Sequence, residues 1–314
     1  MQSSNRIVTA LKQNIARVVV GKEDVVELLL TALLCEGHVL IEDVPGVGKT
    51  TLCSALARSL SCSFKRIQFT PDITPSDITG YTMPSLTGEM QYRPGAIFSQ
   101  IVLADEINRT SPKTQSALLE VMEERQVTVD GVTYPLSRPF LVLATQNPVD
   151  FVSTYPLPEA QMDRFFMRIA IGYPTLEDEM DILERYCGES TPMQSLAPVC
   201  SAEDVLSMQQ EVKQVYCSRE VRGYIASICA ATRATPMLTL GASTRAAIAL
   251  VHAAQASALL CGRDYIIPED VQRMAASVLC HRFVLSADAR MRGFTPEQAL
   301  GELMGGVRVP VRLK

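Results

Sequence analysis

The apolar positions in the first half of the chain follow two patterns, a helical repeat and short uninterrupted runs. Between residues 23 and 35 the apolar side chains recur with the period of a helix that buries one face. Short apolar runs, each bounded by turn residues, lie at 38–41, 64–69, 101–104, 140–145 and 166–171. Helical stretches such as 49–60 and 112–124 separate these runs, so the pattern predicts a mostly parallel sheet with helices on both faces.

The pattern changes after Tyr173-Pro174. Residues 175–187 have helical spacing, residues 188–198 are rich in Ser, Thr and Pro, and helical spacing then dominates to about residue 292. We therefore expect an α/β domain over residues 1–190 and a small all-α domain over residues 191–314. The uncharged segment 246–261 is too short to span a membrane, so we interpret it as a buried helix and expect no membrane span.

Two segments of the first domain are predicted to leave its core. Residues 126–133 have the pattern of a hairpin around Asp130-Gly131, a pair of residues that favours a two-residue turn. Residues 79–94 contain several glycines and prolines, which predicts an exposed excursion.

Composition excludes few function classes. Apolar residues make up 47% of the chain and charged residues 20%, as in an ordinary globular protein with a sizeable core. The net charge is −5, but residues 1–190 carry 16 basic and 24 acidic side chains, whereas the remainder carries 13 and 10. No basic run indicates a phosphate-backbone contact, so we expect no nucleic-acid partner. The opposite charges instead indicate two surfaces that could meet, within or between chains.

The cysteines indicate the compartment. The chain has nine cysteines, an odd number, and none forms a C-x-x-C pair, which argues against a disulfide framework or a zinc ribbon. The polar residues 1–5 carry no apolar segment of a secretory signal. These features predict reduced cysteines and a cytoplasmic location.

A glycine-rich loop follows the first predicted strand. Residues 43–50, Asp-Val-Pro-Gly-Val-Gly-Lys-Thr, match G-x-x-x-x-G-K-[ST] except that Asp43 replaces the first glycine. Such a loop turns its backbone N–H groups toward phosphate at a helix N-terminus, with Lys49 at the β- and γ-phosphates and the Thr50 hydroxyl on Mg²⁺. The residues expected to hold the nucleotide are Pro45, Gly46, Val47, Gly48, Lys49, Thr50 and Thr51. We interpret Asp43 as a turn-forming residue rather than a metal ligand.

Polar residues end two further predicted strands. Asp105 and Glu106 follow the run 101–104, and the alternation of a strand predicts that they face opposite sides. Asp105 is the candidate metal ligand, acting through water together with Thr50, and Glu106 is the candidate general base for the attacking water. Asn147, after the run 140–145, is a candidate to hold the γ-phosphate and that water, or alternatively an Asx turn before Pro148.

Three arginines are candidates to compensate the charge of the transition state. Arg109 follows the acid pair, Arg164 precedes the last predicted strand, and Arg245 opens a predicted helix in the second domain. A surface salt bridge is the ordinary alternative for any of them, and their spacing does not choose among them.

The order of these motifs resembles the MoxR family of AAA+ ATPases. The residues that carry the resemblance lie at 21–23, 38–51, 105–109, 144–148, 159–165, 241–245 and 268–271, so it extends over most of the chain. The resemblance implies a P-loop (AAA+) parallel-sheet core with helices on both faces, followed by a small all-α lid domain. Two residues depart from the family pattern, namely Asp43 and Thr244, since proline commonly precedes the lid arginine.

The resemblance also implies residue roles. Gly46, Gly48, Lys49 and Thr50 are then Walker A, and Asp105 and Glu106 are Walker B. Asn147 is sensor 1, Arg164 the arginine finger that reaches a neighbour's ATP, and Arg245 sensor 2 on the lid. Arg109 joins the charge network around the acid pair. The segments 79–94 and 126–133 resemble the helix-2 insert and the hairpin before sensor 1, which face the pore or the partner in ring ATPases of this clade.

The function implied is ATP-driven, chaperone-like remodelling, maturation or activation of a partner protein, with ATP and Mg²⁺ as cofactors. In this family the partner is often a metalloprotein or a protein with a von Willebrand A domain. ATP is expected between the α/β domain and the lid, completed by the next protomer of a homo-oligomeric ring, a hexamer. The alternatives are a magnesium-chelatase-type motor subunit, a P-loop kinase and a nucleotide-gated scaffold with little turnover.

Overall fold

A parallel sheet of five strands forms the centre of the first domain. The computed structural model describes residues 2–86, 88–147, 154–187 and 192–310. The strands are β1 (Val39–Glu42), β2 (Phe64–Gln68), β5 (Ile101–Asp105), β8 (Leu141–Gln146) and β9 (Met167–Ile169), and they pair in the order β2-β5-β8-β1-β9. Every pair within this sheet is parallel, so all five carboxyl ends lie at one edge. This confirms the predicted fold class.

Helices cover both faces of the sheet because alternate strand residues belong to two apolar clusters. Leu103 and Leu143 pack with α1 (Gln2–Ala16), α2 (Glu23–Leu34) and α3 (Lys49–Ser59). Val102 and Val142 pack with α4 (Pro75–Thr79) and α5 (Pro112–Glu124) on the other face. The apolar runs that form β5 and β8 are therefore strands buried on both sides, whereas the edge strand β2 is largely exposed.

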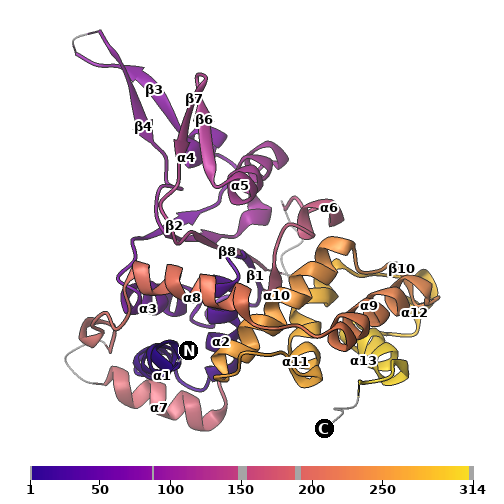
Figure 1. Cartoon of the computed structure of the whole chain (residues 1–314). Coiled ribbons are helices and arrows are strands. Elements are labelled where there is room, and N and C mark those ends of the chain that lie inside the picture. The colour runs from indigo at the N-terminus through magenta and orange to yellow at the C-terminus, as the bar shows by residue number, and fades with distance from the viewer. Residues whose placement is uncertain (1, 87, 148–153, 188–191, 311–314) are drawn as a thin grey trace.

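Two hairpins extend from the α5 side of the molecule (Figure 1). They are β3 (Gly80–Pro84) with β4 (Met90–Pro94), and β6 (Gln126–Val129) with β7 (Val132–Pro135). Asp130 and Gly131 have φ angles of 50° and 78°, which is the two-residue turn that their sequence predicts. The rings of Tyr92 and Tyr134 stack with their centroids 4.0 Å apart, so the two hairpins are joined along their sides.

The second domain is mainly helical. Its helices are α8 (Ala202–Gln214), α9 (Arg219–Ala234), α10 (Thr244–Leu260), α11 (Pro268–Leu279), α12 (Ala287–Met291) and α13 (Pro296–Gly306). The expectation of an all-α domain needs one correction, because β10 (Leu238–Leu240) and β11 (Val284–Leu285) pair in a small antiparallel ribbon. Helix α10 buries most of the uncharged segment 246–261, as predicted. Among the described helices, none is both long enough and apolar enough to cross a membrane.

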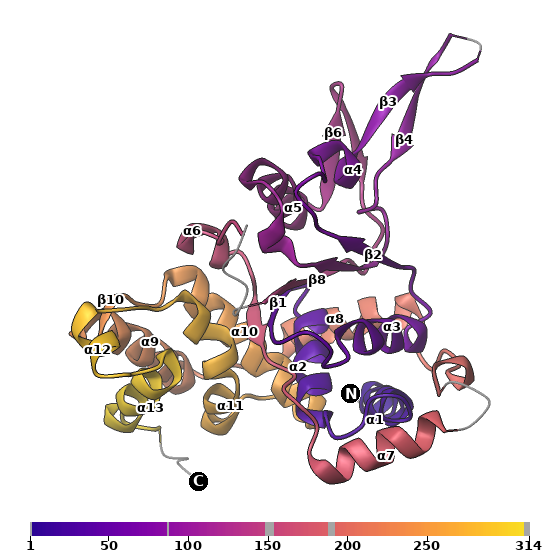
Figure 2. The ribbon, with the colours of Figure 1, turned by 180° about the vertical axis from the view of Figure 1, so that it is seen from behind.

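Short elements join the longer helices and strands. They are α6 (Glu159–Met162), α7 (Leu176–Tyr186) and the 3₁₀ turns at Ile107–Arg109, Pro192–Ser195 and Cys280–Arg282. The predicted domain boundary at residues 190 and 191 falls outside the described residues and stays a prediction. The helical part lies beside the sheet and next to α2 in both views (Figures 1 and 2).

Candidate functional site

The glycine-rich loop connects β1 to α3 at the carboxyl edge of the sheet. Gly46 and Gly48 have φ angles of 86° and 87°, in the left-handed region that side chains rarely adopt. Gly48 caps α3, so the first N–H groups of that helix face the loop. The Lys49 ammonium donates to the carbonyl oxygen of Asp43 at 2.7 Å. Burial lowers the pKa of Lys49, and the carboxylates of Asp43, Asp105 and Glu106 oppose that shift.

Asp43 fastens the loop to the end of β9. Its Oδ1 accepts the N–H of Val44, and its Oδ2 accepts the N–H groups of Ile171 and Gly172 at 2.6 and 2.7 Å. The side chain is buried and used entirely within the chain in this way. These contacts fix the end of β1 through backbone N–H groups, and the interpretation of Asp43 as a turn-forming residue rather than a metal ligand stays a prediction.

The loop borders a cavity of ≈ 380 Å³, which we term the loop cavity. Its lining residues are Pro45, Gly46, Gly48, Lys49, Thr50, Thr51, Arg66, Gln68, Asp105, Glu106 and Asn147. The structure therefore brings together the candidate Walker A residues, the acid pair and the candidate sensor 1. Pro148, the next residue, lies outside the described part of the chain.

Asp105 and Glu106 face the same cavity, so the prediction that they point to opposite sides is wrong. The strand ends at Asp105, and Glu106 takes a left-handed conformation with a φ angle of 60°, which turns its side chain back toward Asp105. The Thr145 hydroxyl joins the two residues, since it donates to Asp105 Oδ1 at 2.5 Å and accepts the N–H of Glu106 at 2.9 Å.

Cationic and amide side chains hold both carboxylates. Arg66 Nη2 lies 2.6 Å from Asp105 Oδ2, and Gln68 Nε2 donates to Glu106 Oε2 at 2.9 Å. Arg109 Nε lies 3.2 Å from Glu106 Oε2, which places Arg109 in the charge network around the acid pair, as expected. Sequence reasoning missed Arg66 and Gln68. The signal in the sequence was their spacing, because two polar residues two positions apart on a strand point to the same face of the sheet.

An apolar pocket of ≈ 230 Å³ continues from the loop cavity, with which it shares Gly46, Gly48 and Thr51. Val18–Val20, Val47, Ile171, Pro174, Ile182 and Tyr186 line it. An apolar pocket beside a phosphate-type loop suits an aromatic base. Sequence reasoning missed this pocket, although the run of three valines before Gly21 was a visible signal.

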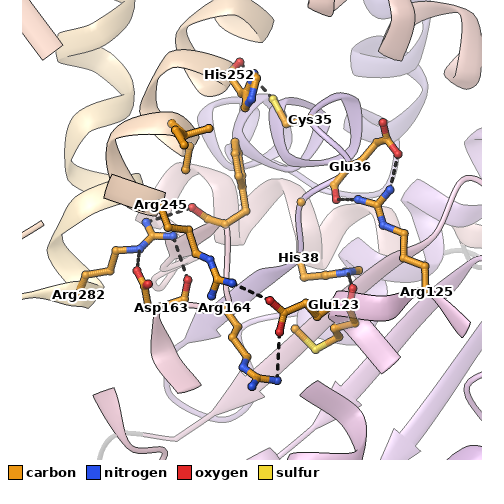
Figure 3. A pocket seen from close by; sticks show the side chains of 15 residues that line it. Cys35, Glu36, His38, Glu123, Arg125, Asp163, Arg164, Arg245, His252 and Arg282 are labelled. Carbon is orange, nitrogen blue, oxygen red and sulfur yellow. Dashed lines mark hydrogen bonds and ion pairs between the residues drawn. The ribbon is translucent and has the colours of Figure 1, made fainter. Parts of the chain in front are cut away.

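Arg164 and Arg245 line a different cavity of ≈ 310 Å³ between the sheet domain and the helical domain, which we term the arginine cavity. Both guanidinium groups converge on one carboxylate, with Arg245 Nη2 at 2.6 Å from Glu123 Oε1 and Arg164 Nη1 at 3.4 Å from Glu123 Oε2 (Figure 3). Thr244 occupies the first position of α10, and Ser243 caps the helix by accepting the N–H of Ala246. The helix start is therefore fixed without the proline of the family pattern.

The expectation that ATP lies between the sheet domain and the lid of one chain needs correction. Among the described residues, none from the helical domain lines the loop cavity or the apolar pocket. The physical reason is that α10 packs against α2 and α8, and α11 packs against β9, so the helical domain sits on the side of the arginine cavity.

Arg282 is a further buried residue of the arginine cavity that sequence reasoning missed. Its Nε lies 2.7 Å from Asp163 Oδ1, and its Nη2 donates to the carbonyl oxygen of Phe165 at 2.7 Å. Burial lowers the pKa of Arg282, and Asp163 opposes that shift. No sequence signal singled it out, because most arginines are exposed. It joins the helical domain to the segment that carries Arg164.

The loop cavity fits a magnesium ion bound together with substrate phosphates. Thr50 and Asp105 offer a hydroxyl and a carboxylate, and Mg²⁺ prefers few protein oxygens with several waters. Among the described residues, no group of three or more His, Cys, Asp or Glu side chains is placed to hold a metal ion by itself. The donor set thus suits an ion that arrives with a nucleotide.

Comparison with known proteins gives a consistent result. A family profile described as "ATPase family associated with various cellular activities (AAA)" matches residues 38–167, and one described as "AAA lid domain" matches residues 230–303. The uncharacterised protein YeaC of Bacillus subtilis is 52% identical over 96% of this chain and 94% of its own length. Chaperone MoxR1 of Mycobacterium tuberculosis is 41% identical over 94% of this chain and 80% of its own length.

A solved structure has the same fold. The crystal structure of a candidate ATPase from Cytophaga hutchinsonii superposes with a TM-score of 0.93 at 38% sequence identity, and it covers 99% of this chain and 97% of its own. Both domains are therefore found together in a relative of nearly the same length. From the fold, the cavity around the glycine-rich loop and these similarities, the chain belongs to the MoxR family of AAA+ ATPases.

Proposed function

We propose that the loop cavity binds Mg·ATP and that a second copy of the chain completes the hydrolytic site with Arg164 and Arg245. The observation that carries this proposal is the separation of the two groups, since the acid pair and Lys49 line one cavity whereas both arginines line another. An arginine that compensates transition-state charge must reach the transferred phosphate. A neighbouring copy is the source that satisfies this requirement.

In this proposal the first cavity and the apolar pocket bind the nucleotide. The backbone N–H groups around Gly46 and Gly48 and the Lys49 ammonium hold the phosphates, while the base occupies the apolar pocket. Thr50 and Asp105 hold the ion, which neutralises charge that develops on the phosphates. Lys49 exchanges its contact with the Asp43 carbonyl for the phosphates.

Glu106 is the proposed base. Its carboxylate takes a proton from the water that attacks the γ-phosphate, and Asn147, which lines the same cavity, orients that water. Gln68 and Arg109 both contact the Glu106 carboxylate at Oε2, and Oε1 is the oxygen proposed to accept the proton. This arrangement suits transfer to water, which supports hydrolysis over transfer to a second substrate.

The wider role that we propose is chaperone-like remodelling, maturation or activation of a protein partner by a homo-oligomeric ring, a hexamer, in the cytoplasm. Similarity to a protein named Chaperone MoxR1 supports a protein partner. Exposed apolar side chains on the β3–β4 hairpin, Tyr81, Leu86 and Met90, offer a contact surface for it. A partner with a von Willebrand A domain is the proposed class.

Complementation between inactive variants tests the shared site. Glu106→Gln and Arg164→Ala should each lose ATP hydrolysis, the second by about 10³-fold or more. Mixed together they should recover part of the activity, because an Arg164→Ala chain keeps an intact loop cavity and a Glu106→Gln chain donates its arginine. The matched control is a mixture of Lys49→Ala and Glu106→Gln chains, which has no intact loop cavity and should stay inactive. Normal hydrolysis by Arg164→Ala alone would contradict the proposal.

The Glu106→Gln variant also tests for a protein partner. Glu106→Gln should bind ATP without turning it over and should retain a protein partner during purification in ATP. Lys49→Ala, which lacks the proposed phosphate contact, is the control and should not retain it. Recovery of the same proteins with both variants would count against a nucleotide-dependent partner.

A further inference from the structure

Arg66 makes a contact in the loop cavity that the hydrolytic mechanism does not use. Its Nε and Nη2 lie 3.0 and 2.6 Å from the same oxygen of Asp105, Oδ2. The other oxygen of Asp105 accepts the Thr145 hydroxyl. The carboxylate proposed to bind the ion is thus held by a guanidinium and a hydroxyl.

The position of Arg66 on β2 explains how it reaches Asp105. Strand β2 is at the edge of the sheet and pairs with β5, so Arg66 lies opposite Leu103 and Gln68 lies opposite Asp105. Residues two apart on a strand point to one face, and Arg66 Nη2 also donates to Gln68 Oε1 at 2.6 Å. The Arg66 side chain is 47% exposed, so it has free space into which to withdraw.

We infer that Arg66 stands in for the magnesium ion on Asp105 while the metal is absent and releases the carboxylate when Mg·nucleotide binds. This inference rests on the proposed function of the loop cavity. Arg66 is a positioning residue here, because it acts on the nucleotide through Asp105.

The carboxylate of Asp105 needs a compensating positive charge. Asp105 is only 13% exposed in its side chain, so leaving it without a cation next to bound phosphates is unfavourable. When a nucleotide binds without Mg²⁺, Arg66 is the cation that offsets Asp105, through the Nε and Nη2 donors that it directs at Oδ2. When Mg²⁺ is present, the ion offsets Asp105 and the guanidinium is no longer needed there.

The test compares binding of fluorescent ATP with and without Mg²⁺ in wild type, Arg66→Ala and Lys65→Ala. Removal of Arg66 should weaken binding in EDTA by about tenfold or more, because Asp105 then repels the phosphates. It should leave the affinity in excess Mg²⁺ within about twofold of wild type. Lys65 is exposed on the opposite face of the same strand, so Lys65→Ala controls for loss of one positive charge and should behave as wild type.

A double variant separates this role from simple attraction of phosphate. In an Asp105→Asn background, Arg66→Ala should have little effect in EDTA, because no carboxylate remains to be offset. An undiminished loss in that background, or an equal loss with and without Mg²⁺, would make Arg66 an ordinary phosphate ligand and overturn the inference. No loss in either condition would overturn it as well. Failure of the wild type itself to bind ATP would overturn the proposed function.

Discussion

At the scale of single residues, His38 is the titratable side chain with the clearest consequence for stability. It precedes β1, and its ring is buried against Phe140 with the centroids 5.4 Å apart. Nε2 donates to the Met122 carbonyl at 2.9 Å, and Nδ1 accepts the N–H of Val142 at 3.0 Å, so the neutral ring satisfies both contacts. Burial lowers the pKa of His38 to about 4, and Arg125 adds to this shift.

The first prediction is a loss of stability in mild acid. The unfolded chain protonates His38 near pH 6.5 and the folded chain only near pH 4, so the unfolded state binds more protons between these values. The free energy of unfolding should therefore fall as the pH decreases from 6.5 toward 4, by up to about 3 kcal/mol from this residue. Urea denaturation at pH 7.5 and 5 measures the change.

Two variants separate His38 from other groups. His38→Gln keeps a donor and an acceptor without titrating, so it should reduce the dependence of unfolding free energy on pH. His252→Gln changes an exposed histidine and should preserve the wild-type slope. An unchanged slope in His38→Gln would exclude His38 as the source.

The residues of the candidate site were predictable to the extent that their neighbours in sequence determine their position. Lys49 and Asp105 follow strands whose carboxyl ends meet at one edge, so their approach follows from local pattern and sheet rules. Arg66, by contrast, depends on the pairing of β2 with β5, which no local pattern shows. The direction of Glu106 depends on one left-handed residue that alternation along a strand does not anticipate.

At the scale of elements, a buried ion pair joins α10 and α11 to the segment between α6 and β9. Arg282 follows α11 and has a side chain only 3% exposed, in contact with Asp163. Ser243, which caps α10, donates to the same carboxylate at 3.1 Å. Asp163, the residue that precedes Arg164, therefore connects two lid elements to the segment that carries Arg164.

The second prediction concerns this connection. Arg282→Ala removes the buried cation from Asp163 and one of two contacts from the Phe165 carbonyl, so the free energy of unfolding should fall by about 3 kcal/mol. Arg292 forms an exposed i,i+4 pair with Asp288 on α12. Arg292→Ala should therefore change the free energy of unfolding by less than about 0.5 kcal/mol. Urea denaturation of both variants checks this. Equal effects would show that burial of the Arg282 pair is unimportant.

Most element boundaries were predictable because periodicity and caps agree. Residues 112–124 form α5 as expected, with Ser111 accepting the N–H of Thr114 and proline at the first position. Helix α1 was missed because its polar start offers little apolar periodicity, although Leu11 and Ile15 are fully buried. The placement of the lid beside α2 was not predictable, since it depends on packing between elements far apart in sequence.

At the scale of the whole molecule, the sheet domain and the helical domain share one apolar core. A single cluster of buried residues extends from Leu143 on β8 through Leu30 on α2 to Ala253 on α10. Gln209 on α8 adds a buried hydrogen bond to the Leu33 carbonyl at 2.7 Å. The two parts therefore differ in sequence pattern, but they share one apolar core.

The third prediction is that both parts unfold together without nucleotide. The chain contains no tryptophan, so Phe64→Trp in β2 and Tyr265→Trp beside α11 each provide one reporter. Fluorescence of either variant should give the same urea midpoint as circular dichroism, as a single cooperative transition requires. A lower midpoint for Tyr265→Trp alone would mean that the helical domain unfolds first.

The contact of Asp43 with Ile171 and Gly172 links the loop of one cavity to the strand that follows Arg164. In the proposed ring, binding or loss of nucleotide at one site would thus be transmitted through β9 to Arg164, which completes the next site. The sites would then hydrolyse ATP in a fixed order around the assembly. Doping active chains with Lys49→Ala chains should then reduce hydrolysis more steeply than in proportion to the dead fraction. When the active chains carry Asp43→Asn, the loss of hydrolysis should become proportional to the fraction of Lys49→Ala chains. An equally steep loss with and without Asp43→Asn would show that this contact does not couple the sites.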